Sequence, residues 1–147
     1  MLPTDYSLMS DMGILALVCW REARGEGLLG KRAVACVVRN RIAANSFFGH
    51  DWHSVILKPY QFSSFNANDP NADKWPEDND PSWEDCCDVA QMVIDGAQDV
   101  TNNALYYFSP PLTEPPREWG SVIPAANIGH LSLWKPGQAV NLDAQDA

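Results

Sequence analysis

Two apolar segments separated by a charged stretch dominate the first third of the sequence. The first contains an unbroken apolar run, Ile14–Cys19, and the second carries apolar residues at helical spacing. We therefore predict helices over Thr4–Glu22 and Leu28–Ala44, with Asp5 or Ser7 as the N-cap of the first. Because the first segment is apolar on nearly every side, we expect it to be the buried central helix.

Shorter elements are predicted in the middle of the chain. Trp52–Leu57 has the pattern of a helical turn, and Tyr60–Phe65 is expected to be irregular or briefly extended. Asn66–Pro81 is rich in Asn, Asp and Pro, which predicts a surface loop that could act as a lid beside a cleft. A long helix then follows, with Ser82 as its N-cap and Asp85 as the acid of a capping box.

The last third of the chain predicts a small sheet. Ala104–Phe108, Val122–Ile123 and His130–Trp134 are short strand-like segments, with Asn127–Gly129 as the turn before the last of them. The residues after Pro136 are polar and are expected to form a loose tail. Helices followed by a sheet predict an α+β architecture.

Length and composition indicate one globular domain. The chain has 147 residues, of which 46% are hydrophobic and 20% charged, enough for a single hydrophobic core. We predict one domain over residues 1–147, with its core at about 5–135. The net charge of -9 argues against binding to nucleic acids and to anionic membranes, which attract basic surfaces.

Targeting signals and cysteine spacing add two expectations. The first residues lack the basic segment of a secretory signal, and the apolar run near residue 15 is too short to span a bilayer. We therefore expect synthesis in the cytoplasm without a signal peptide, and no membrane insertion. The four cysteines lack zinc-site spacing, so we interpret them as free core or surface thiols.

The charged stretch between the first two helices is the best candidate for chemistry. It reads Glu22-Ala23-Arg24-Gly25-Glu26-Gly27, and its glycines favour the end of the first helix, so Glu22 should lie in the last helical turn. Apolar residues behind Glu22 would disfavour its ionised form, as a proton donor requires. This setting suits a working acid, but by itself it does not yet identify a function.

Glu26 is a possible second acid of the same stretch. It would share the face of Glu22 only if the helix continued through Gly25, which the glycine disfavours. We expect instead that Glu26 pairs with Arg24 or Arg39, or caps the following helix.

Four motifs occur in an order that resembles one known family. They are Glu22–Gly27 with the helix ending Arg39-Asn40-Arg41, Val55–Ser63, Asp99–Phe108 and Ile128–His130. Over roughly residues 8 to 134, this pattern resembles the cell-wall hydrolase family of spore cortex-lytic enzymes. The sequence departs from the family at Asn103, where glycine is usual, and just before His130, where an intervening asparagine is missing.

The resemblance implies a lysozyme-like fold and cleavage of the glycan strands of peptidoglycan. The family's catalytic glutamate is the first of its E-A-R-G-E motif, and the resemblance therefore implies that Glu22 is the catalytic residue. We therefore predict a lytic transglycosylase that cuts the MurNAc–GlcNAc backbone with that single carboxylate. The alternative, a hydrolysing muramidase or glucosaminidase, would need a second one, such as Glu26. Two hypotheses of a different class stay open: a non-catalytic wall-binding module, and an amidase or peptidase that uses zinc or a Cys–His pair.

Further candidate residues come from the later motifs. Gln61, Ser63, Tyr107 and His130 are predicted to bind substrate. Because Tyr106 and Tyr107 alternate along a strand, one is expected in the core and the other in the groove. The tryptophans at 75, 83 and 119 could stack on sugars or pack internally. We expect no metal and no cofactor.

The biological setting is also predicted. A short catalytic domain without a wall-binding repeat is typical of a phage endolysin that a holin releases, although a bacterial enzyme with a separate partner would fit the same pattern. The expected partner is the peptidoglycan glycan strand. We expect the enzyme to be a monomer that acts on this strand after the enzyme is released from the cytoplasm. For a phage protein, that would place the enzyme in the host periplasm.

Overall fold

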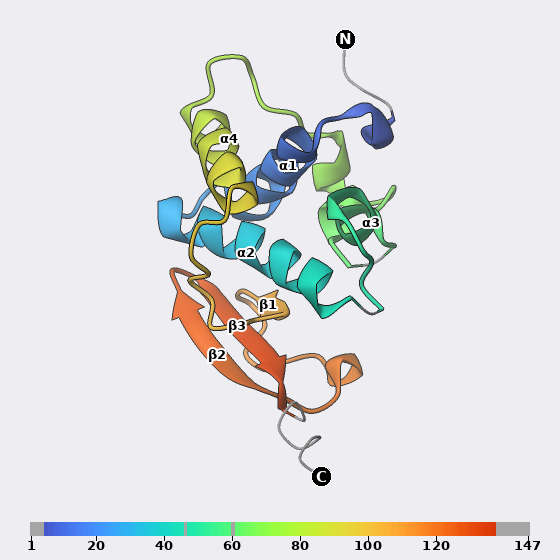
Figure 1. The fold of residues 1–147 in the computed structure, drawn as a ribbon, viewed down its shortest axis with the longest axis vertical. Coiled ribbons are helices and arrows are strands. Elements are labelled where there is room, and N and C mark those ends of the chain that lie inside the picture. Colours follow the sequence, from blue (N-terminus) through green and yellow to red (C-terminus); the bar gives the residue numbers. More distant parts are fainter. Residues whose placement is uncertain (1–4, 46, 60, 138–147) are drawn as a thin grey trace.

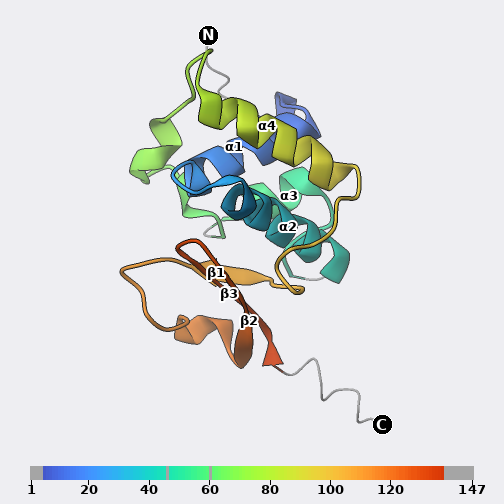
Figure 2. The ribbon, with the colours of Figure 1, turned by 90° about the vertical axis from the view of Figure 1, so that its left-hand side faces the viewer.

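The computed structural model describes residues 5–45, 47–59 and 61–137, which form a helical layer above a small sheet (Figures 1 and 2). Helix α1 (Asp11–Ala23) lies at the centre of this layer and packs against α2 (Leu28–Ala44), α3 (Trp52–Leu57) and α4 (Pro81–Ile94). All residues from Ile14 to Cys19 are 0% exposed. The predictions of an α+β fold and of a buried central first helix are confirmed.

Helix α1 begins later than predicted. Tyr6–Leu8 forms a separate 3-10 helix capped by Asp5, and Met9 then has an extended backbone. Ser10 is the N-cap of α1, because its hydroxyl accepts a hydrogen bond from the Gly13 amide at 2.9 Å. The predicted start at Thr4 lies outside the described residues, and neither Asp5 nor Ser7 caps α1.

The bounds of α2 and α3 agree with the prediction, but the start of α4 does not. Asp80, not Ser82, is the N-cap of α4, and its side chain accepts a hydrogen bond from the Ser82 amide at 2.8 Å. Pro81 then occupies the first helical position, where its missing N–H breaks no helical hydrogen bond. Asp85 therefore has no capping-box role.

The sheet contains the antiparallel strands β1 (Tyr106–Phe108), β2 (Val122–Ile128) and β3 (Leu131–Pro136), in the order β1-β3-β2. β2 is much longer than predicted, because a bulge between Pro124 and Ala126 lets the strand continue past the proline. The longer strand shifts the turn before β3 to Gly129 and His130. Proline is tolerated in β2 because this strand lies at the edge. The predicted tail after Pro136 lies, from residue 138 on, outside the described residues.

The acidic loop before α4 is held by one buried arginine. It contains the 3-10 helix Pro70–Asp73 and follows another 3-10 helix, Ser63–Phe65, in the segment predicted as irregular or extended. The Arg21 guanidinium donates hydrogen bonds to Tyr6 Oη and to three backbone carbonyls, those of residues 64, 72 and 74. We call this arrangement the Arg21 hub. It attaches the loop to α1.

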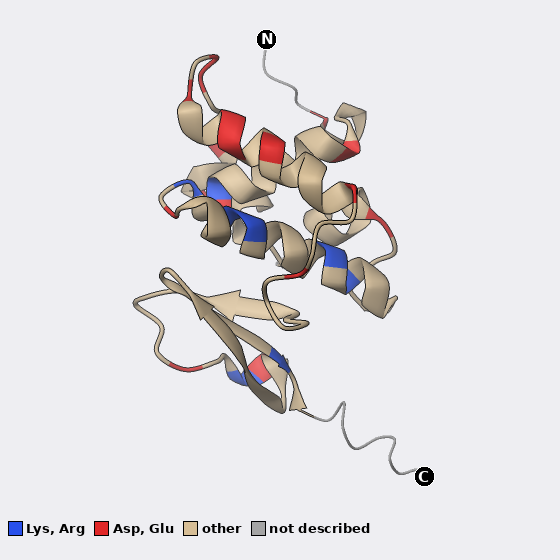
Figure 3. Ribbon diagram, turned by 60° about the vertical axis from the view of Figure 1, so that its left-hand side comes forward, with Lys and Arg blue, Asp and Glu red and all other residues tan. Residues whose placement is uncertain are grey.

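Among the described residues, no group of three or more His, Cys, Asp or Glu side chains is placed to hold a metal ion. Acidic residues gather on α4 and the preceding loop, whereas basic residues follow α2 (Figure 3). All four cysteines are free, as predicted, with Cys19, Cys36 and Cys86 buried. No helix in the described part of the chain is both long and apolar enough to cross a membrane.

Candidate active site

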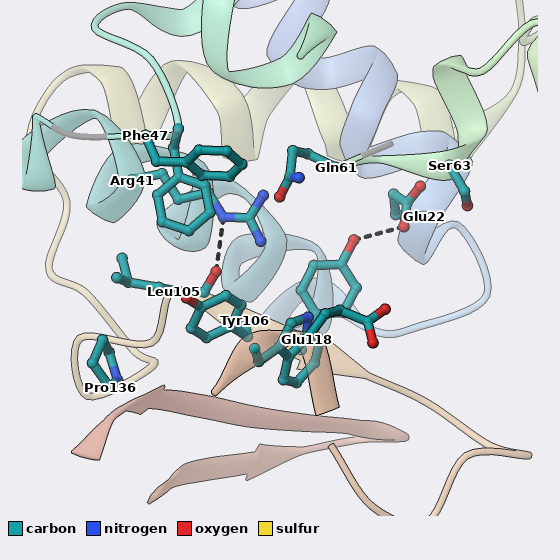
Figure 4. A pocket seen from close by; sticks show the side chains of 12 residues that line it. Glu22, Arg41, Phe47, Gln61, Ser63, Leu105, Tyr106, Glu118 and Pro136 are labelled. Atoms are coloured by element: carbon teal, nitrogen blue, oxygen red, sulfur yellow. Dashed lines mark hydrogen bonds between the residues drawn. The ribbon is translucent and has the colours of Figure 1, made fainter. Parts of the chain in front are cut away.

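A cavity of about 730 Å³ opens between the helical layer and the sheet (Figure 4). It brings together six segments of the chain: the end of α1, the end of α2 with its following loop, the segment after α3, β1 with the residue before it, the loop before β2, and the end of β3. Its lining residues are Glu22, Arg41, Phe47, Phe48, Gln61, Ser63, Leu105, Tyr106, Tyr107, Glu118, Trp119 and Pro136.

Glu22 lies in the last turn of α1, as the sequence predicts, and is half-buried in the cavity wall. Its Oε1 accepts a hydrogen bond of 2.6 Å from the Tyr107 hydroxyl of β1. Burial, together with the neighbouring Glu22 carboxyl, raises the pKa of Tyr107 well above its usual value. The phenol therefore stays protonated and donates to Glu22, which leaves Oε2 for another partner.

The neighbouring tyrosine also lines the cavity, so the expected division between core and groove is wrong. Tyr106 stacks on Trp119, with ring centroids 4.8 Å apart, and forms a T-shaped pair with Phe48, with ring centroids 5.8 Å apart. The irregular loop before β2 carries Trp119 over the strand and thereby makes a second wall for the cavity. Of the three tryptophans considered for sugar stacking, Trp119 lines this cavity.

Gln61 and Ser63 meet Glu22 in the same cavity, on its helical side (Figure 4). Gln61 is half-buried and Ser63 is exposed at the rim. None of residues 66–81 lines the cavity, because the Arg21 hub holds that loop on the other side of α1. The loop therefore does not line this cavity, and its role as a lid stays a prediction.

Arg41, a buried residue of α2, was not among the predicted site residues. It is 4% exposed, and burial lowers its pKa to about 10, although nearby Tyr107, Tyr106 and Glu22 oppose that shift. Its Nε donates a hydrogen bond of 2.7 Å to the Leu105 carbonyl. A signal was present in the sequence: Val34, Val38 and Arg41 follow helical spacing, so the arginine continues the buried stripe.

Glu26 and His130 lie together outside this cavity. Glu26 Oε1 accepts a hydrogen bond from the His130 amide at 3.2 Å, and Oε2 lies 3.1 Å from His130 Nδ1. Neither Arg24 nor Arg39 pairs with Glu26 as predicted: Arg24 lies over the Trp20 ring and Arg39 donates to a backbone carbonyl of α4. We call this pair the Glu26–His130 clamp, because it joins the α1–α2 loop to the β2–β3 turn.

Two glycines make room for the clamp. A Cβ at Gly30 would lie 2.6 Å from the Cβ of Glu26, and a Cβ at Gly129 would collide with Glu26 Oε1. Gly129 also has φ +57, in the left-handed region that glycine adopts without strain.

Asn103, where the family usually has glycine, has φ 67, a conformation that asparagine tolerates.

Comparison with known proteins identifies the family. A family model described as Cell Wall Hydrolase matches residues 25–131. The chain belongs to the cell wall hydrolase family. The resemblance inferred from the four motifs, and with it the assignment to a family of enzymes, is thereby confirmed.

Relatives and solved structures agree with this family. The chain is 35% identical over 108 residues to a spore cortex-lytic enzyme of Oceanobacillus iheyensis and 33% identical over 110 residues to one of Bacillus cereus, covering 74% of this chain in each case. It spans 35% and 38% of the length of those two relatives.

The solved structures extend the likeness across the fold. The catalytic domain of the germination-specific lytic transglycosylase SleB from Bacillus anthracis has a TM-score of 0.67 and 30% identity, over 91% of this chain and 100% of that one. The catalytic domain of Bacillus cereus SleB has the same TM-score and identity and is covered over 95% of its length. The lysozyme-like fold is confirmed.

Proposed function

We propose that this domain cleaves the glycan strands of peptidoglycan as a lytic transglycosylase, with Glu22 as the catalytic residue. The observation that supports this most directly is the hydrogen bond from Tyr107 to Glu22 at the wall of the cavity. It fixes one carboxyl oxygen and leaves the other directed to a substrate. The SleB catalytic domains, which share the fold, include one described as a lytic transglycosylase.

The proposed reaction uses Glu22 twice. The protonated carboxyl gives its proton to the glycosidic oxygen between MurNAc and GlcNAc, and the bond from that oxygen to C1 of MurNAc breaks. The resulting Glu22 carboxylate then takes the proton of the MurNAc 6-hydroxyl as O6 bonds to C1. The products are a 1,6-anhydromuramic end and a new GlcNAc end, Glu22 is protonated again, and no water is consumed.

Hydrolysis by two carboxylates is the second candidate, and one observation bears on it. Glu26, the sequence-predicted second acid, is held by His130 outside the cavity. Glu118, on the 3-10 helix Arg117–Trp119, lines the cavity with Glu22 and its side chain extends along it (Figure 4). A hydrolase would therefore use Glu118, not Glu26, to activate water.

We also propose roles for the other predicted site residues. Gln61, Ser63 and Tyr107 would contact the sugar or position Glu22, since all three line the cavity. For His130 the clamp favours a positioning role over direct sugar contact.

Product analysis tests the proposed reaction. Purified sacculi digested with the protein are analysed by mass spectrometry, with Glu22→Gln as the inactive control. Anhydromuramic ends support transglycosylation, reducing ends support hydrolysis, and free stem peptides contradict both. Activity that survives EDTA would exclude a zinc amidase. If the unchanged protein and Glu22→Gln both bind sacculi but the unchanged protein does not cleave them, the binding-module hypothesis would be favoured.

The endolysin role, the monomeric state and action on the wall after holin-dependent release stay predictions. Co-expression with and without a holin gene would test the release, because an endolysin should lyse the cell only when the holin is present. Light scattering of the purified protein would test the monomer.

A further inference from the structure

Arg41 presents unused hydrogen-bond donors inside the cavity. The guanidinium extends from α2 into the cavity, on the side of Gln61 (Figure 4). Nε bonds the Leu105 carbonyl, but Nη1 is buried without a hydrogen-bond partner in the described part of the chain. No described carboxylate forms an ion pair with it. Of the described residues that line the cavity, Arg41 is the only basic one.

A buried guanidinium without a counter-ion is unfavourable, and the aromatic surroundings offset only part of this penalty. The Arg41 guanidinium carbon lies 4.5 Å from the Phe48 ring centroid, 4.9 Å from that of Phe62 and 5.9 Å from that of Tyr106. These ring faces attract the cation but do not accept the N–H groups that lie in the guanidinium plane. The in-plane donors match the two oxygens of a carboxylate.

We propose that Arg41 forms a carboxylate-binding subsite of the cavity, which recognises a carboxylate carried by the lactyl substituent of the muramic acid residue. This inference rests on the proposed function. Muramic acid is the sugar whose C1 reacts at Glu22, and its lactyl substituent is the anionic branch attached to that same sugar. Glu22 and Arg41 line one cavity, so one bound sugar can meet both.

Two sources can supply this carboxylate. In a strand stripped of peptides the lactyl group ends in its own carboxylate, whereas in an intact strand the stem peptide that extends it carries the carboxylates. Both present the same chemistry to Arg41. Specificity would then depend on which of the two reaches the guanidinium when C1 lies at Glu22.

Three glycan substrates distinguish these sources from a neutral control. The first carries free lactyl carboxylates, the second carries the same groups as neutral methylamides, and the third keeps intact stem peptides. A charge-assisted pair with arginine predicts that kcat/KM on one or both acidic substrates exceeds that on the methylamide about ten- to hundred-fold. Preference for the first alone identifies the lactyl carboxylate, and preference for the third alone identifies the stem peptide.

Variants of Arg41 assign the preference to this residue. Arg41→Gln should reduce the acidic-to-neutral ratio of kcat/KM to about one, whatever its effect on the rate with the neutral methylamide, and Arg41→Lys should keep part of the ratio. The matched control is Arg39→Gln, which removes a charge from the same helix outside the cavity and should leave the ratio unchanged.

Each contrary outcome has a distinct meaning. Equal kcat/KM of the unchanged protein on all three glycans contradicts the subsite proposal but leaves the proposed function intact. This comparison needs no variant, so it can be made even if Arg41→Gln does not fold. An equal loss by Arg41→Gln on acidic and neutral glycans also overturns it, since the arginine would then be structural. Failure to cleave any of the three overturns the proposed function, and the subsite with it.

Discussion

Two buried arginines, Arg21 and Arg41, have nearly the same surroundings but different hydrogen bonding. Both are at most 5% exposed, and each has its guanidinium carbon within 6 Å of three aromatic rings. Arg21 donates to four acceptors, three of them backbone carbonyls. Arg41 donates to a single carbonyl and keeps Nη1 without a partner in the described part of the chain.

The difference shows how the same residue type can serve the fold or the site. At the Arg21 hub the protein itself supplies the acceptors, so the cation holds a loop in place and has few donors left for a ligand. At the cavity the aromatic rings hold the Arg41 cation but leave in-plane donors free. A buried charge whose partners are missing within the protein points to a ligand, whereas a saturated one points to structure.

The largest expected effect belongs to the cavity side of this comparison. Glu22→Gln removes the proposed proton donor and should reduce the cleavage rate of sacculi by about three orders of magnitude. The thermal midpoint should change little, because the amide oxygen of the substituted side chain can still accept a hydrogen bond from Tyr107. Glu26→Gln is the matched control and should keep most of the activity; an equal loss in both variants would contradict the assignment.

At the hub, the expected effect is on stability. Arg21→Gln leaves several buried acceptors unpaired and should lower the free energy of unfolding by about 3 kcal/mol, measured by urea titration. The rate per folded molecule and the preference between acidic and neutral glycans should stay unchanged. A change in that preference would erase the distinction between the two arginines.

Tyr107→Phe tests whether the hydrogen bond from Tyr107 positions Glu22. It deletes the hydrogen bond to Glu22 but keeps the ring, so kcat should decrease about tenfold while KM changes little. Tyr106→Phe keeps the bond to Glu22 and should lose less activity. Steady-state kinetics on soluble glycan fragments measure both, and a larger effect of the Tyr106 change would contradict the positioning role of Tyr107.

The smallest effect is expected at the Glu26–His130 clamp. His130 has 78% of its side chain exposed, so solvent screens its interaction with Glu26. Glu26→Gln should destabilise the fold by about 1 kcal/mol or less, as a shift of the urea midpoint shows. A loss as large as that of Arg21→Gln would mean that the clamp stabilises the fold as much as the hub does.

Local signals explain which parts of the fold the sequence could predict. Helices α2 and α3 carry their own periodicity and end signals, and their observed bounds agree with the prediction. The start of α1 was missed because Asp5, Ser7 and Ser10 are all good N-caps and only the extended backbone at Met9 decides between them. The length of β2 was missed because Pro124 argues against a strand unless the strand is known to be at an edge.

The site was predictable where one motif sufficed and not where distant segments meet. The position of Glu22 in the last turn of α1 could be predicted because Gly25 and Gly27, which come shortly after it in the sequence, mark the end of the helix. The partner of Glu26 lies 104 residues away, and no local pattern connects it to His130. The helical spacing of Val34, Val38 and Arg41 places the arginine on the buried side of α2, but only the packing of the sheet below α2 makes it a cavity residue.

The most direct test of the central claim is digestion of sacculi in water labelled with heavy oxygen, followed by mass spectrometry of the new glycan ends. If Glu22 acts first as acid and then as base on the 6-hydroxyl, the unchanged protein yields anhydromuramic ends without label, and Glu22→Gln yields none. Reducing ends that carry the heavy oxygen would contradict this account.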